Sequence, residues 1–363
     1  MTLILGIETS CDETGAAVVE DAGRVRSNVV ASQHELHRKY QGVVPEIASR
    51  AHIERITPVV DEALKSAGVQ LGDLDAIAVG NRPGLIGSLL VGVEAAKMLA
   101  WASGRPLIGI DHIQAHLYAA WLSPVARSDE AQPDCPPAAY PALGLVVSGG
   151  HTNLFEVISS TTMHLLGQTI DDAVGEAYDK AAVILDAGYP GGPRVDLLAQ
   201  KGDPKAVTFP RSMLGKTSLD FSFSGLKTSL LYTVRGLPQG RGRSPRFPRS
   251  AADLTEDRRA DLAASFQAAA VDSLIQKIQR AIDQLTQRQR TPTCLIIGGG
   301  VSANSLLRVR AIELGRQRGL PVHLPQLAYC LDNAAMIAGL AHELYRQRRV
   351  DDLHLPARAG RGE

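Results

Sequence analysis

Cysteine is scarce in this sequence, and neither charge is in excess. The four cysteines, Cys11, Cys135, Cys294 and Cys330, are scattered and none belongs to a CxxC pair, which argues against a disulfide framework or a zinc ribbon and fits a reducing compartment. The 38 basic and 38 acidic residues cancel, so a nucleic-acid partner would have to be held by a local basic patch.

Signals for export and for membrane insertion are also lacking. The N-terminal residues MTLILGIETSCDETG have no basic start and turn acidic after a short apolar run, unlike a signal peptide. The most hydrophobic stretch, residues 84–102, carries Glu94 and Lys97, and it is expected to form a buried helix rather than to span a membrane. We therefore expect a cytoplasmic protein with no membrane partner.

The length and composition are those of a folded chain with about two domains. The chain has 363 residues, of which 45% are hydrophobic and 21% are charged, and domains usually contain about 100–200 residues. This composition excludes a disordered, collagenous or coiled-coil protein.

Apolar strands alternate with amphipathic helices, which predicts an α/β architecture with covered sheets. Residues 3–20 and 143–158 each predict a hairpin with a polar tip, and their likeness favours one supersecondary unit used twice. Residues 262–285 carry apolar side chains at three- and four-residue spacing, typical of a long amphipathic helix. A strand and a glycine turn are expected over residues 294–300, followed by a helix that begins near Ser302.

Two histidines four residues apart, His112 and His116, could hold one metal ion from adjacent turns of a helix. A pair of histidines on a helix surface is the plain alternative. Asp332 is a candidate third ligand by residue type, and such a set would suit iron or zinc. The glutamate that a zinc protease places after its first histidine is absent, because position 113 is isoleucine.

Two glycine turns could bring backbone amides against a phosphate. They cover residues 146–152 and 298–304, and neither matches the GxxxxGK[ST] loop. Singly, each is adequately explained as a turn. Together with the acidic first hairpin, which carries Glu8, Asp12 and Glu13, they indicate a nucleotide cleft between two similar domains.

Three further segments combine charge with turn residues. Residues 170–180 read as a helix capped by aspartates, with a solvated face as the default, and Asp179 or Asp196 could accept hydrogen bonds from ribose hydroxyls or an ammonium group. Residues 219–228 (LDFSFSGLKT) read as a strand end and helix cap. Residues 235–249 contain five arginines and no acid, and form either a solvated loop or an arm that meets phosphates.

These motifs, taken in order, resemble one family. GIETSCDETG, GVVPEIASRAH, LVVSGGHT, IDDAVGEAYDKAA, YPGGP, LDFSFSGLKT, GGGVSAN and DNAAMIA are similar to those of the tRNA N6-adenosine threonylcarbamoyltransferases, the TsaD family, once called O-sialoglycoprotein endopeptidases. The resemblance runs from residue 4 to about residue 340, nearly the whole chain.

The resemblance implies an actin-like ATPase (ASKHA) fold with two similar domains and an interdomain cleft. On this basis we expect an N-terminal domain at residues 1–125, a linker at 126–142, a C-terminal domain at 143–345 and a polar tail at 346–363. The implied reaction moves the threonylcarbamoyl group of threonylcarbamoyladenylate to the exocyclic amine of adenosine 37 in tRNAs that read ANN codons, releasing AMP. An actin-fold kinase acting on a small molecule or a protein is the main alternative, ahead of a metalloprotease or a scaffold paralogue.

The resemblance also implies residue roles and partners. It makes one divalent metal ion the cofactor, iron with zinc as the alternative, and a catalytically inactive paralogue and a P-loop ATPase the protein partners. It names no general base. The implied metal ligands are His112, His116 and Asp332, and the implied substrate-binding residues are Val146, Val147, Ser148, Gly149, Gly150, Asp179, Gly192, Asp196 and Asn304.

Three positions depart from the family pattern. Arg82 and Ala334 stand where glycine is usual, and Asp111 stands where a histidine is common. An arginine forced into a left-handed backbone would cost on the order of 1 kcal/mol. None of the three is an implied ligand, so activity is expected.

Overall fold

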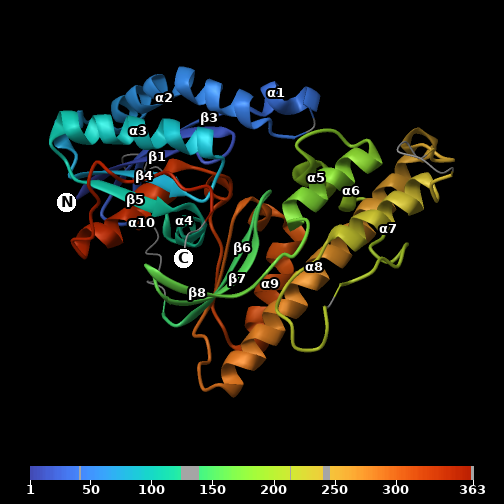
Figure 1. The fold of residues 1–363 in the computed structure, drawn as a ribbon. Helices are drawn as coiled ribbons and strands as arrows, with labels where there is room; N and C mark the ends of the chain where they lie inside the picture. The colour runs from blue at the N-terminus through green and yellow to red at the C-terminus, as the bar shows by residue number, and fades with distance from the viewer. Residues whose placement is uncertain (41, 124–138, 213, 240–245, 361–363) are drawn as a thin grey trace. The chain divides into compact units, whose positions relative to one another are not determined.

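The chain folds into two compact units that do not follow strict chain order (Figure 1). The computed structural model describes residues 1–40, 42–123, 139–212, 214–239 and 246–360. Unit 1 comprises residues 1–138, 158–163 and 324–363, and unit 2 comprises residues 139–157 and 164–323. Most of the expected linker and the centre of the arginine-rich segment, residues 240–245, lie outside the described residues.

Unit 1 contains a five-stranded sheet in the order β3-β2-β1-β4-β5. β1 pairs antiparallel with β2, which confirms the first predicted hairpin, and parallel with β4, which is itself parallel to β5. The carboxyl ends of β1, β4 and β5 therefore meet at one edge of the sheet. The strands are β1 (Leu3–Glu8), β2 (Glu13–Glu20), β3 (Arg24–Ser32), β4 (Ala76–Arg82) and β5 (Leu107–Asp111).

Alternating side chains give this sheet two apolar faces. Leu3, Leu5 and Ile7 pack with α2 and α3, whereas Ile4 and Ala17 pack with α10 on the opposite face. Figure 1 shows α2 and α3 on one side of the strands and α10 and α4 on the other. The helical segments of unit 1 are α1 (His34–His37), η1 (Arg38–Tyr40), α2 (Pro45–Ala67), η2 (Leu71–Asp73), α3 (Ile86–Ser103), α4 (His112–Tyr118), η3 (Ala119–Trp121), η6 (Leu327–Tyr329) and α10 (Ala334–Arg346).

α3 is the apolar helix expected at residues 84–102. Among the described residues it is the one helix whose length and composition would allow it to cross a bilayer, a test that core helices of soluble proteins also pass. α3 packs against β4 and α2 and buries Leu89 and Val93, but Leu90, Met98 and Trp101 are exposed. The sequence led us to expect a buried helix. The structure buries this helix along one face only.

Unit 2 contains a second five-stranded sheet, in the order β10-β9-β6-β7-β8. β6 pairs antiparallel with β7 and parallel with β9, just as β1 does with β2 and β4. This confirms the second hairpin and the repeated unit. The strands are β6 (Ala142–Val147), β7 (Thr152–Ser159), β8 (Thr162–Gln168), β9 (Leu295–Gly298) and β10 (Val322–His323).

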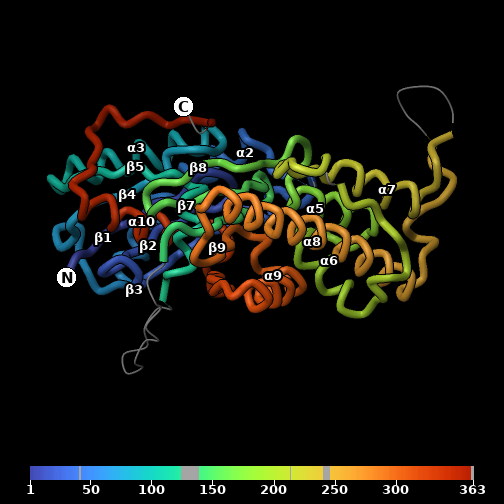
Figure 2. The backbone as a smooth tube through the Cα atoms, turned by 90° about the horizontal axis from the view of Figure 1, so that it is seen from below, coloured from blue at the N-terminus to red at the C-terminus, as the bar shows by residue number. Residues whose placement is uncertain are grey.

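The helices of unit 2 include the predicted long amphipathic one, α8, which has 32 residues. α8 packs mainly against α6 and also contacts α9 and β6, and Figure 2 shows α8 running beside both helices. The segments are α5 (Val174–Leu185), α6 (Gly191–Ala199), α7 (Ser224–Arg235), η4 (Ala251–Asp253), α8 (Glu256–Gln287), η5 (Gly300–Ala303) and α9 (Ser305–Arg318).

The helix after β9 begins at Ser305 rather than near Ser302, because the glycine turn continues as a 3₁₀ segment. Gly299 has a left-handed φ of 91°, and a Cβ there would lie 2.4 Å from the carbonyl oxygen of Val147. Only glycine allows this close approach of backbone to the end of β6.

α10 brings the C-terminal part of the chain back to the first sheet. It contacts β1, β2 and β4, and residues 334–342 are all buried. The expected domain boundaries follow chain order and place residues 143–345 in one domain. They therefore do not include the return of α10 to the first sheet.

Candidate functional site

The histidine pair lies where β5 runs directly into α4. Asp111 ends the strand and caps the helix, because its side chain accepts a hydrogen bond from the Gln114 N–H at 3.1 Å. His112 and His116 therefore occupy successive turns of a helix, as predicted. Their rings meet edge to face at 4.5 Å between centroids, and both are buried, with 4% and 0% exposure.

Asp332 reaches both imidazoles from a segment more than 200 residues away in sequence. It precedes α10, whose cap Asn333 accepts from the Met336 N–H at 3.0 Å. Asp332 Oδ1 lies 3.5 Å from His112 Nε2 and 3.1 Å from His116 Nε2. One atom from each of the three residues falls within 4.8 Å of the others, so the structure brings the three implied ligands together within unit 1.

These separations fit a metal ion. Ligand atoms held about 2.1 Å from a metal at angles of about 90–110° lie roughly 3.0–3.4 Å apart. Among the described residues, neither ring nitrogen of the buried His116 has a hydrogen-bond partner, and the 3.1 Å contact with Asp332 lacks hydrogen-bond geometry. An ion bound here would satisfy a polar group whose burial is otherwise costly.

Glu8 supports the centre from behind His112. It ends β1 and is fully buried. Its Oε2 lies 2.9 Å from His112 Nδ1, and its Oε1 accepts from the Ser10 N–H at 2.5 Å. A carboxylate on the second nitrogen of a metal-binding imidazole fixes the ring and raises its basicity. Sequence analysis identified Glu8 as one acid of the first hairpin but did not pair it with His112.

Electrostatics favour positive charge at this centre. Burial alone would lower the pKa of His112, but the negative charges of Glu8 and Asp332 outweigh it and raise the pKa to about 9. Burial, followed by the charge of His112, lowers the pKa of His116. A metal cation can take the place of the proton on His112, since metal ligands must be deprotonated.

A second group of ligand-type side chains in the described part of the chain is formed by Asp12, Glu13 and His34. Glu13 Oε1 lies 3.1 Å from His34 Nε2. Burial, with the negative charges of Asp12 and Asp332, raises the pKa of Glu13 to about 8, although the hydrogen bond with His34 opposes this rise. Glu13 can therefore hold or release a proton near neutral pH. Sequence analysis included the two acids but missed His34.

Two of the three departures from the family pattern lie beside this centre and contact each other. Arg82 ends β4 outside the left-handed region, so the strain considered for it does not arise. Its Nε lies 3.6 Å from Asp111 Oδ2, across the register that pairs the two residues. The third, Ala334, packs against Gly6, where a Cβ would lie 2.3 Å from the Ala334 carbonyl oxygen.

A double-mutant cycle tests whether these two departures depend on each other. We expect Arg82→Gly and Asp111→Asn to show a coupling in the free energy of unfolding of about 0.2–1 kcal/mol, the range of partly exposed ion pairs. Asparagine keeps the acceptor that caps α4, so the cycle isolates the charge. Urea unfolding of the four proteins measures the coupling, and a value of zero would mean that the two replacements are independent.

The implied binding residues at the tip of the second hairpin form a tight turn in unit 2. Val146 and Val147 are buried in β6. The Ser148 N–H donates to the His151 carbonyl at 2.8 Å, and a Cβ at Gly149 or Gly150 would meet nothing within 4 Å. The turn therefore presents open backbone at its tip, as the sequence predicted.

The other implied binding residues gather around α6. Asp179 Oδ1 accepts from the Gly191 N–H at 2.9 Å, next to Gly192, whose surroundings are open. Asp196 accepts from the side chains of Asn304 and Ser305 at 3.3 and 2.7 Å. Asp196 and Asn304, which are far apart in sequence, are thus in direct contact.

The expectation that aspartates cap the helix after residue 172 is wrong. α5 has Ala173 at its cap position and no capping side chain. Asp171 instead accepts from the Phe223 N–H at 2.8 Å and the Ser224 N–H at 3.3 Å at the start of α7. Asp172 lies 2.8 Å from Lys180 and 2.7 Å from Lys227. The carboxylates of Asp171 and Asp172 therefore bind these partners instead of capping α5.

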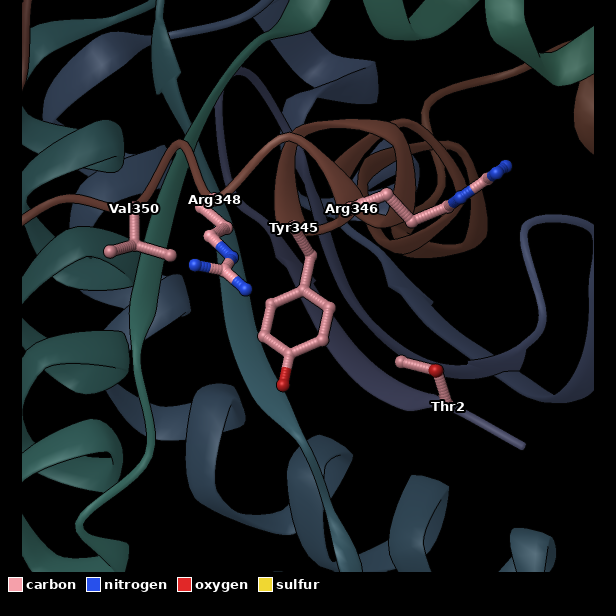
Figure 3. A pocket seen from close by; sticks show the side chains of 5 residues that line it. All are labelled: Thr2, Tyr345, Arg346, Arg348 and Val350. Atoms are coloured by element: carbon pink, nitrogen blue, oxygen red, sulfur yellow. The ribbon is translucent and has the colours of Figure 1, made fainter.

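A surface hollow of about 350 Å³ lies in unit 1, away from the metal ligands. Figure 3 shows Tyr345 and Arg348 side by side, with Arg346 directed away from them. The hollow lies at the C-terminal end of α10, whereas Asp332 precedes the N-terminal end of the same helix. The helix has 13 residues and is therefore about 20 Å long. None of the predicted site residues lines the hollow, which is formed by Thr2, Tyr345, Arg346, Arg348 and Val350.

Two units of the same sheet topology define the actin-like ATPase (ASKHA) class of α/β proteins, and solved structures share this fold. T. kodakarensis HypF matches with a TM-score of 0.57 and 14% identity over 96% of this chain and 48% of its own. Component A of the Acidaminococcus fermentans (R)-2-hydroxyglutaryl-CoA dehydratase matches with a TM-score of 0.50 and 14% identity over 96% and 99%. At such identities these likenesses establish the fold alone.

Sequence comparison narrows the class to one family. Residues 24–339 match the family described as tRNA N6-adenosine threonylcarbamoyltransferase. Proteins of that name from Moorella thermoacetica and Anaeromyxobacter dehalogenans are 48% and 49% identical, and the matches cover 98% and 96% of this chain and 96% of each relative. The chain belongs to the tRNA N6-adenosine threonylcarbamoyltransferase family, and it is a transferase enzyme that modifies tRNA.

Proposed function

We propose that this enzyme transfers the threonylcarbamoyl group of threonylcarbamoyladenylate to the exocyclic amine of adenosine 37 in tRNAs that read ANN codons, releasing AMP. The observation that carries this proposal is the convergence of His112, His116 and Asp332 in a chain of this family. The adenylate is the donor because its carbamoyl–phosphate bond is already activated.

The reaction forms a bond between the adenine nitrogen and the carbamoyl carbon, and it breaks the bond from that carbon to the phosphate oxygen. The amine loses a proton, and AMP leaves with the bonding electrons. The adenine amine is a weak nucleophile because its lone pair is delocalised into the ring. Transfer therefore depends on orienting the donor and on stabilising the departing phosphate.

Each group of residues has a role in this proposal. His112, His116 and Asp332 would hold the metal ion, which when bound supplies a Lewis acid for the carbonyl or an anchor for the phosphate. Glu8 keeps His112 in the orientation to ligate. In unit 2, residues 146–150 with Asp179, Gly192, Asp196 and Asn304 would bind the adenylate.

We propose iron as the resident ion because the family resemblance implies it, with zinc as the alternative, since a set of two imidazoles and one carboxylate suits either metal. We also propose that the enzyme works in the cytoplasm with an inactive paralogue of the same fold and a P-loop ATPase.

A labelling experiment tests the function and the partners together. Purified enzyme is incubated with tRNA and threonylcarbamoyladenylate carrying labelled threonine, with and without the paralogue and the ATPase. We expect label in tRNA at adenosine 37, dependence on the paralogue and the ATPase over repeated turnovers, and metal in the same sample by elemental analysis. Loss of label from a tRNA with guanosine at position 37 is the control.

Other results would contradict the proposal. Phosphoryl transfer to a sugar or a protein without labelling of tRNA would favour the kinase alternative of this fold. Full labelling by an enzyme free of metal would remove the metal from the mechanism, and full repeated turnover without the two proteins would remove those partners.

A further inference from the structure

We infer that Gln267 is a positioning residue that aims one oxygen of Asp196 at a ribose hydroxyl of the adenylate, and so makes the enzyme specific for ribonucleotides. The inference rests on the proposed function, because that function supplies an adenylate as the ligand of unit 2. Gln267 lies on α8, outside every motif that resembles the family.

The direction of the hydrogen bonds around Gln267 is fixed by the backbone. Asn304 Oδ1 accepts from the Leu307 N–H at 3.0 Å and caps α9. The amide nitrogen of Asn304 must then face Gln267, whose Oε1 accepts from it at 2.8 Å. Gln267 Nε2 is left to donate, and it donates to Asp196 Oδ1 at 2.9 Å.

The two oxygens of Asp196 are used unequally. Oδ1 accepts from Gln267 and also from the Asn304 amide and the Ser305 hydroxyl, at 3.3 and 2.7 Å. Among the described residues, Oδ2 accepts from the Ser305 N–H at 3.2 Å. A carboxylate has about four lone-pair sites, two on each oxygen. Oδ1 is therefore saturated by the protein, while Oδ2 keeps acceptor capacity for a ligand.

The exposure of the side chains distinguishes the residue that would contact the ligand, Asp196, from the residue that positions it, Gln267. Gln267 has 3% exposure and Asn304 has 8%, whereas Asp196 is half-buried. The amide of Gln267 thus acts through Asp196 rather than on the ligand. Because water cannot easily replace a buried donor, its loss would free the carboxylate to turn and would leave Asn304 unpaired.

A site built to accept from a hydroxyl rejects the analogue that lacks it, since the acceptor is then left unpaired. AMP, the product of the proposed reaction, has two ribose hydroxyls, and 2′-deoxy-AMP and 3′-deoxy-AMP each lack one. We expect the wild-type protein to bind AMP at least about tenfold more tightly than one of the two deoxynucleotides.

The test is calorimetric titration of the full-length protein with these three nucleotides. Gln267→Met keeps the length of the side chain but cannot donate, and we expect it to weaken AMP binding about tenfold while the affinity for the rejected deoxynucleotide stays unchanged. Gln284→Met is the matched control: it lies on the same helix and donates to the Thr217 carbonyl at 2.8 Å, so it should keep the preference for AMP.

Gln267→Glu adds a second readout. It places a carboxylate against Asp196, so AMP should bind weakly at neutral pH and recover as the pH falls and one proton is shared between the two groups. This pH dependence is expected only if AMP binding depends on the carboxylate of Asp196, so its absence would contradict the inference.

Three further outcomes would overturn the inference: Gln267→Met keeps the wild-type preference, Gln267→Met weakens all three nucleotides equally, or the wild type shows no hydroxyl preference. Labelling of tRNA by the wild type together with any of these leaves the proposed function intact and removes the role of Gln267. A clear ribose preference without any labelling of tRNA would instead contradict the proposed function.

Discussion

Replacing His116 by alanine is expected to remove the bound metal and to slow threonylcarbamoyl transfer to tRNA by about a hundredfold or more, because even residues behind a metal ligand cost 10–100-fold. His116 is fully buried, and its Nε2 lies 3.1 Å from Asp332. In the group formed by His112, His116 and Asp332, no other side chain can replace the ligand nitrogen of His116. Metal analysis and the labelling assay on one purified sample measure both losses.

The protein should still fold when His116 is removed. Deleting a buried side chain costs about 1–3 kcal/mol, and this imidazole makes no hydrogen bond among the described residues that would be broken. His342→Ala is a matched control, since His342 is a buried imidazole of unit 1, on α10, with 8% exposure. Both variants should lose similar stability, and only His116→Ala should lose metal.

The result that would undo the metal centre is a folded His116→Ala protein that keeps full transfer without metal. Equal loss of metal in His342→Ala would be as damaging, because the effect would then follow from weakened folding of unit 1.

The two hairpins and the long helix could be predicted because each is determined by residues within a short stretch of sequence. Apolar runs on either side of a polar turn in residues 3–20 and 143–158 predict two hairpins, and both are found. Three- and four-residue spacing predicts the long helix, found at residues 256–287. These signals depend only on residues that are close together in the sequence.

The order of strands in a sheet is not a local property, and it decides what surrounds the histidines. Glu8, Arg82 and Asp111 end three different strands, β1, β4 and β5. They meet because these strands lie side by side and parallel. The sequence identifies Glu8 as the end of a strand, but it does not predict that Arg82 and Asp111 end strands. The contacts of Glu8 with His112 and of Arg82 with Asp111 follow only from the sheet order.

The return of the chain in α10 is also invisible to local patterns. Asp332 was a candidate ligand by residue type alone, and the contact depends on the packing of residues 334–342 on the first sheet. Asp171 illustrates the opposite case, in which a local rule points to the wrong helix. Its carboxylate meets four donors around the start of α7, and these outweigh a cap on α5.

Replacing Glu8 by glutamine is expected to lower metal affinity by about 10–100-fold, the usual cost of losing a carboxylate behind a metal-binding histidine. Glutamine keeps one acceptor oxygen, which can face His112 Nδ1, while its amide NH2 then faces the Ser10 N–H. The substitution therefore removes the charge of Glu8 together with one hydrogen bond. Titration of the metal-free protein with ferrous or zinc ions measures the change.

The same substitution should change the pKa of His112 in a known direction. The charge of Glu8 is the largest influence that raises this pKa to about 9, against the opposing effect of burial. Without the charge of Glu8, less opposes the effect of burial, which lowers the pKa of His112. The metal-free Glu8→Gln protein should therefore lose the His112 proton at a lower pH in an NMR titration. Asp75→Asn is the matched control, because Asp75 accepts from the Leu3 N–H at the other end of β1.

Together, the pKa of His112 and the metal affinity separate the effect of Glu8 on the proton from its effect on the metal. A lower pKa with weaker metal binding would mean that Glu8 acts by making His112 a more basic ligand. A lower pKa with unchanged metal affinity would contradict that role, because the carboxylate would then affect the proton and not the metal. Loss of metal affinity in Asp75→Asn as well would assign the effect to the stability of the first sheet.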